Sequence, residues 1–133
     1  METPFDLLFN AAAMQVRSRI GPEGKARGSM ELPSGLLISG SFEGDLTVNG
    51  DMLVDPGAAF FGGRALIHGD LYVAGLIGLQ ALEDLRTIIQ CRGRVYAGQS
   101  SEIRGVLRCG ELILYKGNRM NAMVETGLEF DAS

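Results

Sequence analysis

The sequence predicts an all-β fold in which short strands wind into a parallel β-solenoid. Three observations predict it: glycines recur at short regular steps, a longer repeat runs through the same region, and the composition suits a narrow core. Glycine accounts for 19 of the 133 residues, while 46% of the residues are apolar and only 7% are aromatic. A narrow solenoid interior takes Val, Leu, Ile, Ala and Met and needs a conformationally permissive residue at each corner.

The glycine spacing marks the corners. Steps of six or seven residues separate Gly44, Gly50, Gly57, Gly63, Gly69 and Gly75. The segments between them are short and alternate in polarity, as in 45–49 (DLTVN) and 70–74 (DLYVA). Such spacing allows one short strand and then one turn.

The longer repeat defines the coils. A shift of 19 residues places Val48–Val54 on Ile67–Val73. Continuing in steps of 18 or 19 predicts two apolar columns, which are Met52, Leu71, Ile89, Leu107 and Val54, Val73, Cys91, Cys109. Between residues 35 and 127 this gives about five three-strand coils, or a rod on the order of 25 Å long at ~4.8 Å per coil. The leucines of 76–90 could also line a helix, so a bulge or an inserted turn is expected there.

The first 34 residues differ from this body. Residues 3–20 are predicted to form a helix, because Thr3 suits the N-cap and Pro4 the first helical position. The apolar residues of this segment fall on one face: Phe5, Leu8, Phe9, Ala12, Val16 and Ile20. Residues 21–34 (GPEGKARGSMELPS) are predicted to be a linker. The expected organisation is a flexible tail at 1–34, a β-helical domain at 35–127 and a C-terminal tail at 128–133.

Three fates are open for the predicted helix. Phe5, Leu8 and Phe9, with arginines behind them, could lie in a membrane interface. The helix could instead fold back over the first coil, or have no fixed structure. The sequence leaves these alternatives open.

Composition excludes several classes of function. The net charge is −4 and the pI is near 4.9, which argues against nucleic acid as a partner. No apolar run is long enough to span a membrane, and acidic residues precede the first apolar stretch, so neither a membrane span nor a secretory signal is expected. Two cysteines are too few for a disulfide framework, which favours a reducing cytoplasm.

Few residues of the chain are candidates for catalysis. The single histidine, His68, is expected to be a turn residue, although it could act as the base of an acyltransferase built on a hexapeptide repeat. Cys91 and Cys109 are expected to stack in the core as inert side chains. Lys25 follows Gly24 but lacks the rest of a phosphate-binding loop. No catalytic residue, metal site or cofactor is predicted, so the chain is expected not to be an enzyme.

The two open ends of a solenoid are the remaining candidate site. Each end exposes unpaired strand edges and a slice of core, which natural proteins either cap or use. Neither flank of the body offers a convincing cap. The predicted self-association surface consists of Leu36, Ile38 and Phe42 on the N-terminal side and Leu128 and Phe130 on the C-terminal side.

Three stretches of the chain resemble the bactofilins. They are 40–63 (GSFEGDLTVNGDMLVDPGAAFFGG), 65–75 (ALIHGDLYVAG) and 110–126 (GELILYKGNRMNAMVET), and the resemblance covers about 35–127. Bactofilins are bacterial polymer-forming cytoskeletal proteins with a right-handed β-helical core between short tails. The resemblance implies filaments that form without nucleotide through their end coils. It also implies peripheral association with the inner face of the cell membrane, and scaffolding of cell-wall or morphogenesis proteins.

Two alternatives from other classes remain open at this point. One is the acyltransferase that uses His68, which would form trimers. The other is a small β-helical adaptor that stops at a dimer and binds a partner. The number of copies in the assembled particle separates all three hypotheses.

Overall fold

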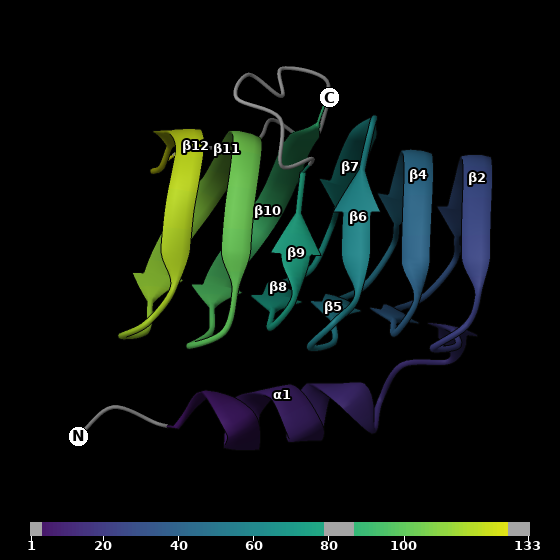
Figure 1. The fold of residues 1–133 in the computed structure, drawn as a ribbon, viewed down its shortest axis with the longest axis horizontal. Coiled ribbons are helices and arrows are strands. Elements are labelled where there is room, and N and C mark those ends of the chain that lie inside the picture. Colours follow the sequence, from purple (N-terminus) through teal and green to yellow (C-terminus); the bar gives the residue numbers. More distant parts are fainter. Residues whose placement is uncertain (1–3, 79–86, 128–133) are drawn as a thin grey trace.

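The computed structural model describes residues 4–78 and 87–127, and it shows a right-handed parallel β-helix of about six turns. The strands of successive turns lie side by side along the rod, and one helix runs along its flank (Figure 1). The predicted fold class is therefore confirmed. All described strand pairings join strands of neighbouring turns and are parallel.

Each turn contributes to three faces of the rod. The first face consists of β1 (Ser18–Ile20), β3 (Leu36–Ile38), β5 (Met52–Val54), β8 (Leu71–Val73), the end of β10 (Ile88–Ala97) and the end of β11 (Glu102–Leu114). The second face consists of the first parts of β2 (Lys25–Leu32), β4 (Ser41–Val48), β11 and β12 (Arg119–Glu125), with β6 (Ala59–Phe61) and β9 (Leu76–Ile77) between them. The third face consists of β7 (Arg64–Ile67), the start of β10 and the later parts of β2, β4, β11 and β12.

In-register pairing stacks the inward side chains into columns, one residue per turn. The column of the second face is Ala26, Phe42, Phe60, Ile77, Ile103 and Met120. The column of the third face is Met30, Leu46, Ala65, Ile89, Leu107 and Val124. The interior members of both columns are buried, and the rings of Phe42 and Phe60 stack with centroids 5.9 Å apart. The core is therefore a continuous apolar cylinder along the rod.

The predicted columns are correct in part. Met52 pairs with Leu71 as expected, but Leu71 then pairs with Val95, whereas Ile89 belongs to the third face. The cause is a longer connection in this turn: two residues separate β6 from β7, whereas 78–87 separate β9 from β10. A prediction that assumes a constant step of 18 or 19 residues therefore assigns Ile89 to the first face, where the structure has Val95. Within 76–90, where a bulge or an inserted turn was expected, residues 79–86 lie outside the described residues.

The solenoid begins one turn earlier than expected. Residues 21–34 were predicted to be a linker, yet β2 pairs with β4 residue by residue, from Lys25 on Ser41 to Leu32 on Val48. Gly28 lies at the corner of this turn with a φ of 116°, a conformation that favours glycine. The predicted domain start at residue 35 is therefore corrected to residue 18, where β1 begins.

A stack of glycines forms the corner between the third and first faces. The N–H of Gly69 donates to the carbonyl of Gly50 at 3.0 Å, and a Cβ added at Gly50 would lie 2.7 Å from the nitrogen of Gly35. Beside the stack, Asp51 Oδ1 accepts a hydrogen bond from the N–H of Asp70 at 2.8 Å. Asp70 Oδ1 in turn accepts one from the N–H of Arg94 at 2.8 Å. These contacts leave no room for a side chain on the corner.

The helix α1 (Phe5–Ala13) lies along the first face and covers several turns (Figure 1). It ends earlier than the expected residue 20, because Ile20 belongs to the core of the first turn. Thr3, the expected N-cap, lies outside the described residues. The buried side of the helix segment consists of Phe5, Phe9, Ala12 and Val16. These residues pack on the outward side chains of the first face and on a tyrosine beyond it: Leu37, Leu53, Tyr72, Tyr96 and Tyr115.

Ring contacts extend along this flank. Tyr72 and Tyr96 stack with centroids 4.7 Å apart, and Phe5 meets Tyr115 edge-on at 5.5 Å. A Cβ added at Gly98 would lie 2.6 Å from the Phe5 ring, so the helix fits closely. The helix therefore packs along several turns of the rod. It does not cover the first coil alone, which was one of the alternatives that the sequence left open.

Removing the Phe9 ring should destabilise the fold. We expect Phe9→Ala to lower the free energy of unfolding by about 2–4 kcal/mol, because the ring is buried between α1 and the first face. Leu7→Ala is the matched control, since Leu7 lies on the outer side of the same helix and should cost under about 0.5 kcal/mol. Urea titration followed by circular dichroism measures both, and equal losses would contradict the docking of the helix.

The glycine corner gives a second expectation. Gly50→Ala should destabilise the protein by about 1–3 kcal/mol, because the new methyl group meets backbone atoms of the previous turn. Gly21→Ala is the control, since no atom lies within 4 Å of a Cβ there. The difference in thermal midpoint between the two variants measures the effect.

Candidate assembly surfaces

The two ends of the rod carry open strand edges. At the N-terminal end, β1 pairs only with β3 and β2 only with β4 among the described strands. At the C-terminal end, β12 pairs only with β11, and 111–114 of β11 pair only with β10. One edge of each of these strands therefore presents N–H and C=O groups without a neighbouring strand from the described residues.

The core is also open at both ends, as the column of the third face illustrates. Its interior members are at most 2% exposed, whereas Met30 at one end is 40% exposed and Val124 at the other is 38% exposed. Leu114, which ends a column of the first face, is 50% exposed. Each end thus shows a cross-section of the hydrophobic core to solvent.

Large exposed apolar side chains fall at few places in the described part of the chain. Four belong to the end turns: Met30, Leu114, Met123 and Val124. The other two, Leu7 and Met14, lie on α1 or at its end. The described residues of the middle turns contribute none, so among the described residues the exposed apolar side chains are concentrated at the ends and on the outer side of the helix.

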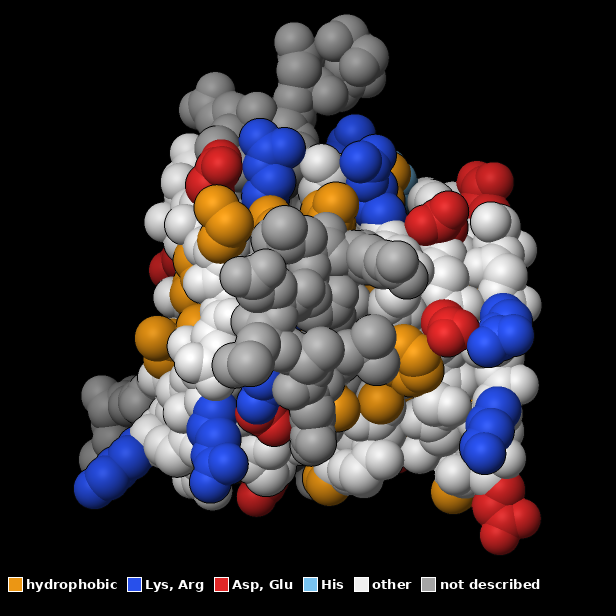
Figure 2. All heavy atoms as spheres, turned by 45° about the horizontal axis from the view of Figure 1, so that its top comes forward, with side chains coloured by type: hydrophobic (Ala, Val, Ile, Leu, Met, Phe, Trp, Pro, Cys, Tyr) orange, Lys and Arg blue, Asp and Glu red, His pale blue; other side chains and the backbone are white. Residues whose placement is uncertain are grey.

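Both ends carry charges of both signs. On β2, Lys25 and Arg27 precede Glu31, and on β12, Arg119 precedes Glu125. Figure 2 shows acidic and basic side chains on both halves of the rod. Neither end carries charges of one sign only, so electrostatic repulsion does not prevent two ends from associating.

The structure shifts the predicted N-terminal surface by one turn. Leu36, Ile38 and Phe42 are at most 1% exposed, because the first turn covers them. Their partners in the first turn are Ser18, Ile20 and Ala26, and Met30 and Leu32 are the further apolar residues of that end. A sequence signal for this turn exists, since Gly28 pairs with Gly44 at the same corner. Leu128 and Phe130 lie outside the described residues.

The predicted membrane-contact residues lie at the helix interface. Phe5 and Phe9 are buried against the first face, and Leu8 is half-buried. In this arrangement the solenoid occupies the surface that would enter a lipid interface. No helix in the described ranges is long and apolar enough to cross a bilayer.

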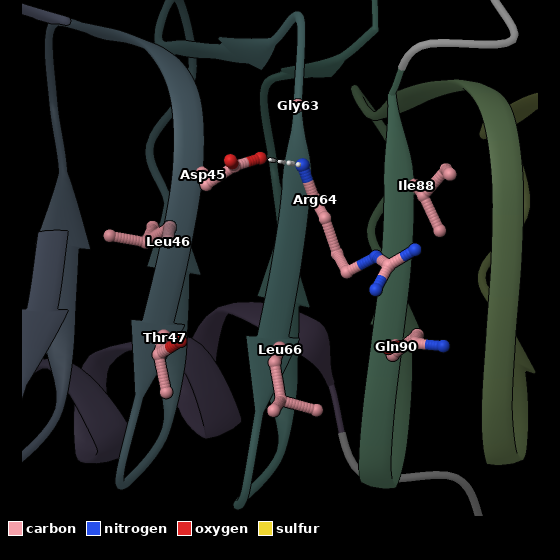
Figure 3. A pocket seen from close by; sticks show the side chains of 8 residues that line it. All are labelled: Asp45, Leu46, Thr47, Gly63, Arg64, Leu66, Ile88 and Gln90. Atoms are coloured by element: carbon pink, nitrogen blue, oxygen red, sulfur yellow. Dashed lines mark hydrogen bonds between the residues drawn. The ribbon is translucent and has the colours of Figure 1, made fainter. Parts of the chain in front are cut away.

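The third face carries a groove (Figure 3). It has a volume of about 560 Å³, and β4, β7 and β10 contribute its walls. The carboxylate in this groove belongs to Asp45, and its Oδ1 already accepts a hydrogen bond from the backbone N–H of Arg64 at 3.0 Å. The side chains that line it are Asp45, Leu46, Thr47, Arg64, Leu66, Ile88 and Gln90, which include no histidine or cysteine.

His68 lies in the turn between β7 and β8. Its N–H donates to the carbonyl of Val48 at 3.0 Å, so its backbone belongs to the ladder between turns. It is not among the residues that line the groove on the third face or three smaller grooves.

The two cysteines lie where the sequence places them, stacked in the core. Cys91 pairs with Cys109 in the next turn, and both are 0% exposed. Their column continues from Ile67 on the third face, and not from Val73 as predicted. Burial raises the pKa of Cys91 to about 12 and also raises the pKa of Cys109. A thiol held protonated in this way is a poor nucleophile.

The comparisons with known proteins add no relative. No model of a known family matches the chain, and neither does any curated protein or solved structure. Among the described residues, no group of three or more His, Cys, Asp or Glu side chains could hold a metal ion. The candidate site is therefore the pair of open ends, which the geometry of the solenoid itself defines.

Burial of the cysteines leads to a testable expectation. In the folded protein neither thiol should react with a disulfide reagent at pH 8, and both should react in guanidinium chloride. Because the folded pKa of Cys91 is raised, its contribution to stability is complete below the ordinary thiol pKa near 9.0 and is lost as the pH rises toward about 12. Thiol titration against pH measures this, and rapid reaction of the folded protein would contradict it.

Proposed function

We propose that this chain is a non-enzymatic scaffold that assembles end to end into filaments without nucleotide. The observation that carries the proposal is a core column open at both ends, with Met30 and Val124 as its exposed terminal members. Another layer of the same geometry would bury the exposed core side chains and pair the open strand edges. A second copy of the chain supplies such a layer.

The energetic argument follows from what an end contact buries. Joining two ends covers the exposed core side chains and pairs the open strand edges in one step. The spacing is that of the solenoid itself, because a junction between strands repeats the ~4.8 Å separation of neighbouring strands. Association needs no hydrolysis, since the favourable terms are burial and backbone pairing.

The arrangement of the two surfaces favours an open polymer. They lie at opposite ends of the rod, so contact at one end leaves the other free (Figure 1). Repeated association through two opposite surfaces extends the particle unless symmetry closes it. A filament therefore follows more directly than a closed trimer.

The cellular part of the proposal rests on the resemblance to bactofilins. We propose that the filaments support cell shape or cell-wall morphogenesis at the inner membrane, with cell-wall or morphogenesis proteins as partners. The membrane contact would require α1 to leave the first face, because its two phenylalanines are buried there.

Charges placed at the column ends test the assembly. Met30→Arg and Val124→Arg each add a charge to one end, and burying that charge at a junction is costly. A chain with one usable end can form nothing larger than a dimer, whether like or unlike ends meet. Gln99→Arg adds the same charge at an exposed turn between the first and second faces and should leave filaments unchanged.

Electron microscopy and light scattering without nucleotide measure the outcome. The unmodified protein and Gln99→Arg should give filaments, while the two end variants should give monomers or dimers with unchanged circular dichroism. An unmodified protein that stays monomeric at high concentration would overturn the proposal.

A further inference from the structure

The outer side of α1 carries an apolar stripe that the fold of one chain does not use. Leu7 is 63% exposed and Met14, directly after the helix, is 85% exposed. They are seven residues apart, which is about two helical turns, so they lie on the same side. Ala11 lies between them and is also exposed. We name these three residues the outer stripe.

We propose that the outer stripe is a lateral contact between filaments, in which α1 of one copy packs antiparallel on α1 of a second copy. This inference rests on the proposed end-to-end assembly and adds a second, sideways surface to it. The end surfaces lengthen the filament, and the outer stripe pairs one filament with another.

The width of the stripe favours a helix as its occupant. A single row at positions i, i+4 and i+7 is the narrow seam of a helix pair, whereas a helix lying in a lipid interface needs a broad apolar face. The broad face of α1 is already buried against the solenoid. Ala11 at the centre of the stripe has a small side chain, which lets two helices approach closely.

Charge determines the direction of the pair. Asp6 is exposed in the first turn of α1, and Arg17 is exposed just beyond its end. An antiparallel pair that aligns Leu7 of each copy with Met14 of the other brings the acidic first turn of each α1 toward the end of the other helix, after which Arg17 follows. A parallel pair would place like charges together, which is unfavourable. Complementary charge thus identifies a second copy of this chain as the occupant.

The contact is too small to act alone. α1 has only nine helical residues, so it spans about 14 Å, and a stable dimer needs roughly 800 Å² buried on each partner. In a filament the same contact repeats with every copy, and linked contacts gain strength from their high effective concentration. Lateral pairing is therefore expected between filaments, not between single rods.

Cysteine cross-linking tests the geometry. Ala11→Cys places a thiol next to its counterpart in an antiparallel pair, so mild oxidation should give covalent dimers on a non-reducing gel. Gln15→Cys is the matched control, because Gln15 is exposed on the flank and should cross-link at least tenfold more slowly. Cys91 and Cys109 are buried and do not compete. Equal cross-linking of both variants would overturn the proposed pairing.

Electron microscopy tests the consequence. Leu7→Glu should convert paired filaments into single ones, because it places a charge in the seam, while Gln15→Glu adds the same charge on the flank and should leave them paired. Single filaments in the unmodified protein would overturn the lateral contact and leave end-to-end assembly intact. Absence of any filament would instead overturn the assembly itself.

Lipid is the competing occupant of the outer stripe, and a separate experiment tests it. The filaments are sedimented with vesicles of phosphatidylglycerol and phosphatidylcholine. We expect Leu7→Glu and Gln15→Glu to sediment with them alike. Loss of vesicle binding in Leu7→Glu alone, with Ala11→Cys cross-links absent, would assign the stripe to lipid and overturn the pairing of helices.

Discussion

In-register parallel pairing between successive turns is the constraint on which the rest of the structure depends. It places each residue directly on its counterpart in the next turn, so inward side chains form columns. It brings corner backbones so close that glycine is required, as at Gly50 over Gly35. It also leaves the first and last turns with a missing neighbour. The packed core, the glycine corners and the open ends are thus three consequences of one geometry.

The parts that the sequence predicted are those that repeat. Val48–Val54 and Ile67–Val73 share their corners and apolar positions, and Val54 does pair with Val73. The stacking of Cys91 on Cys109 was predictable for the same reason, since an 18-residue step separates them within a regular part of the chain. Short-range repetition carries this information because each turn meets only its neighbours.

The parts that it missed depend on features outside the repeat. The first turn resembles a linker because charged residues such as Lys25 and Glu31 face solvent on β2 and dilute its apolar positions. The register between Leu71 and Val95 changes because one connection is longer. The docking of α1 requires outward residues of the first face, such as Tyr72 and Tyr96, to gather from separate turns. Only the folded solenoid brings them together.

The position of α1 explains how open ends can coexist with a stable rod. In a solenoid each turn contacts only the next, so the end turns tend to fray. α1 and the residues that follow it link distant turns, because Val16, three residues after the helix, lies against Gly35 near the start and Phe5 meets Tyr115 near the end. A rod stabilised along its flank needs no cap over its ends. The ends are therefore left free for other copies, and the side of α1 that faces away from the solenoid is left as a separate surface.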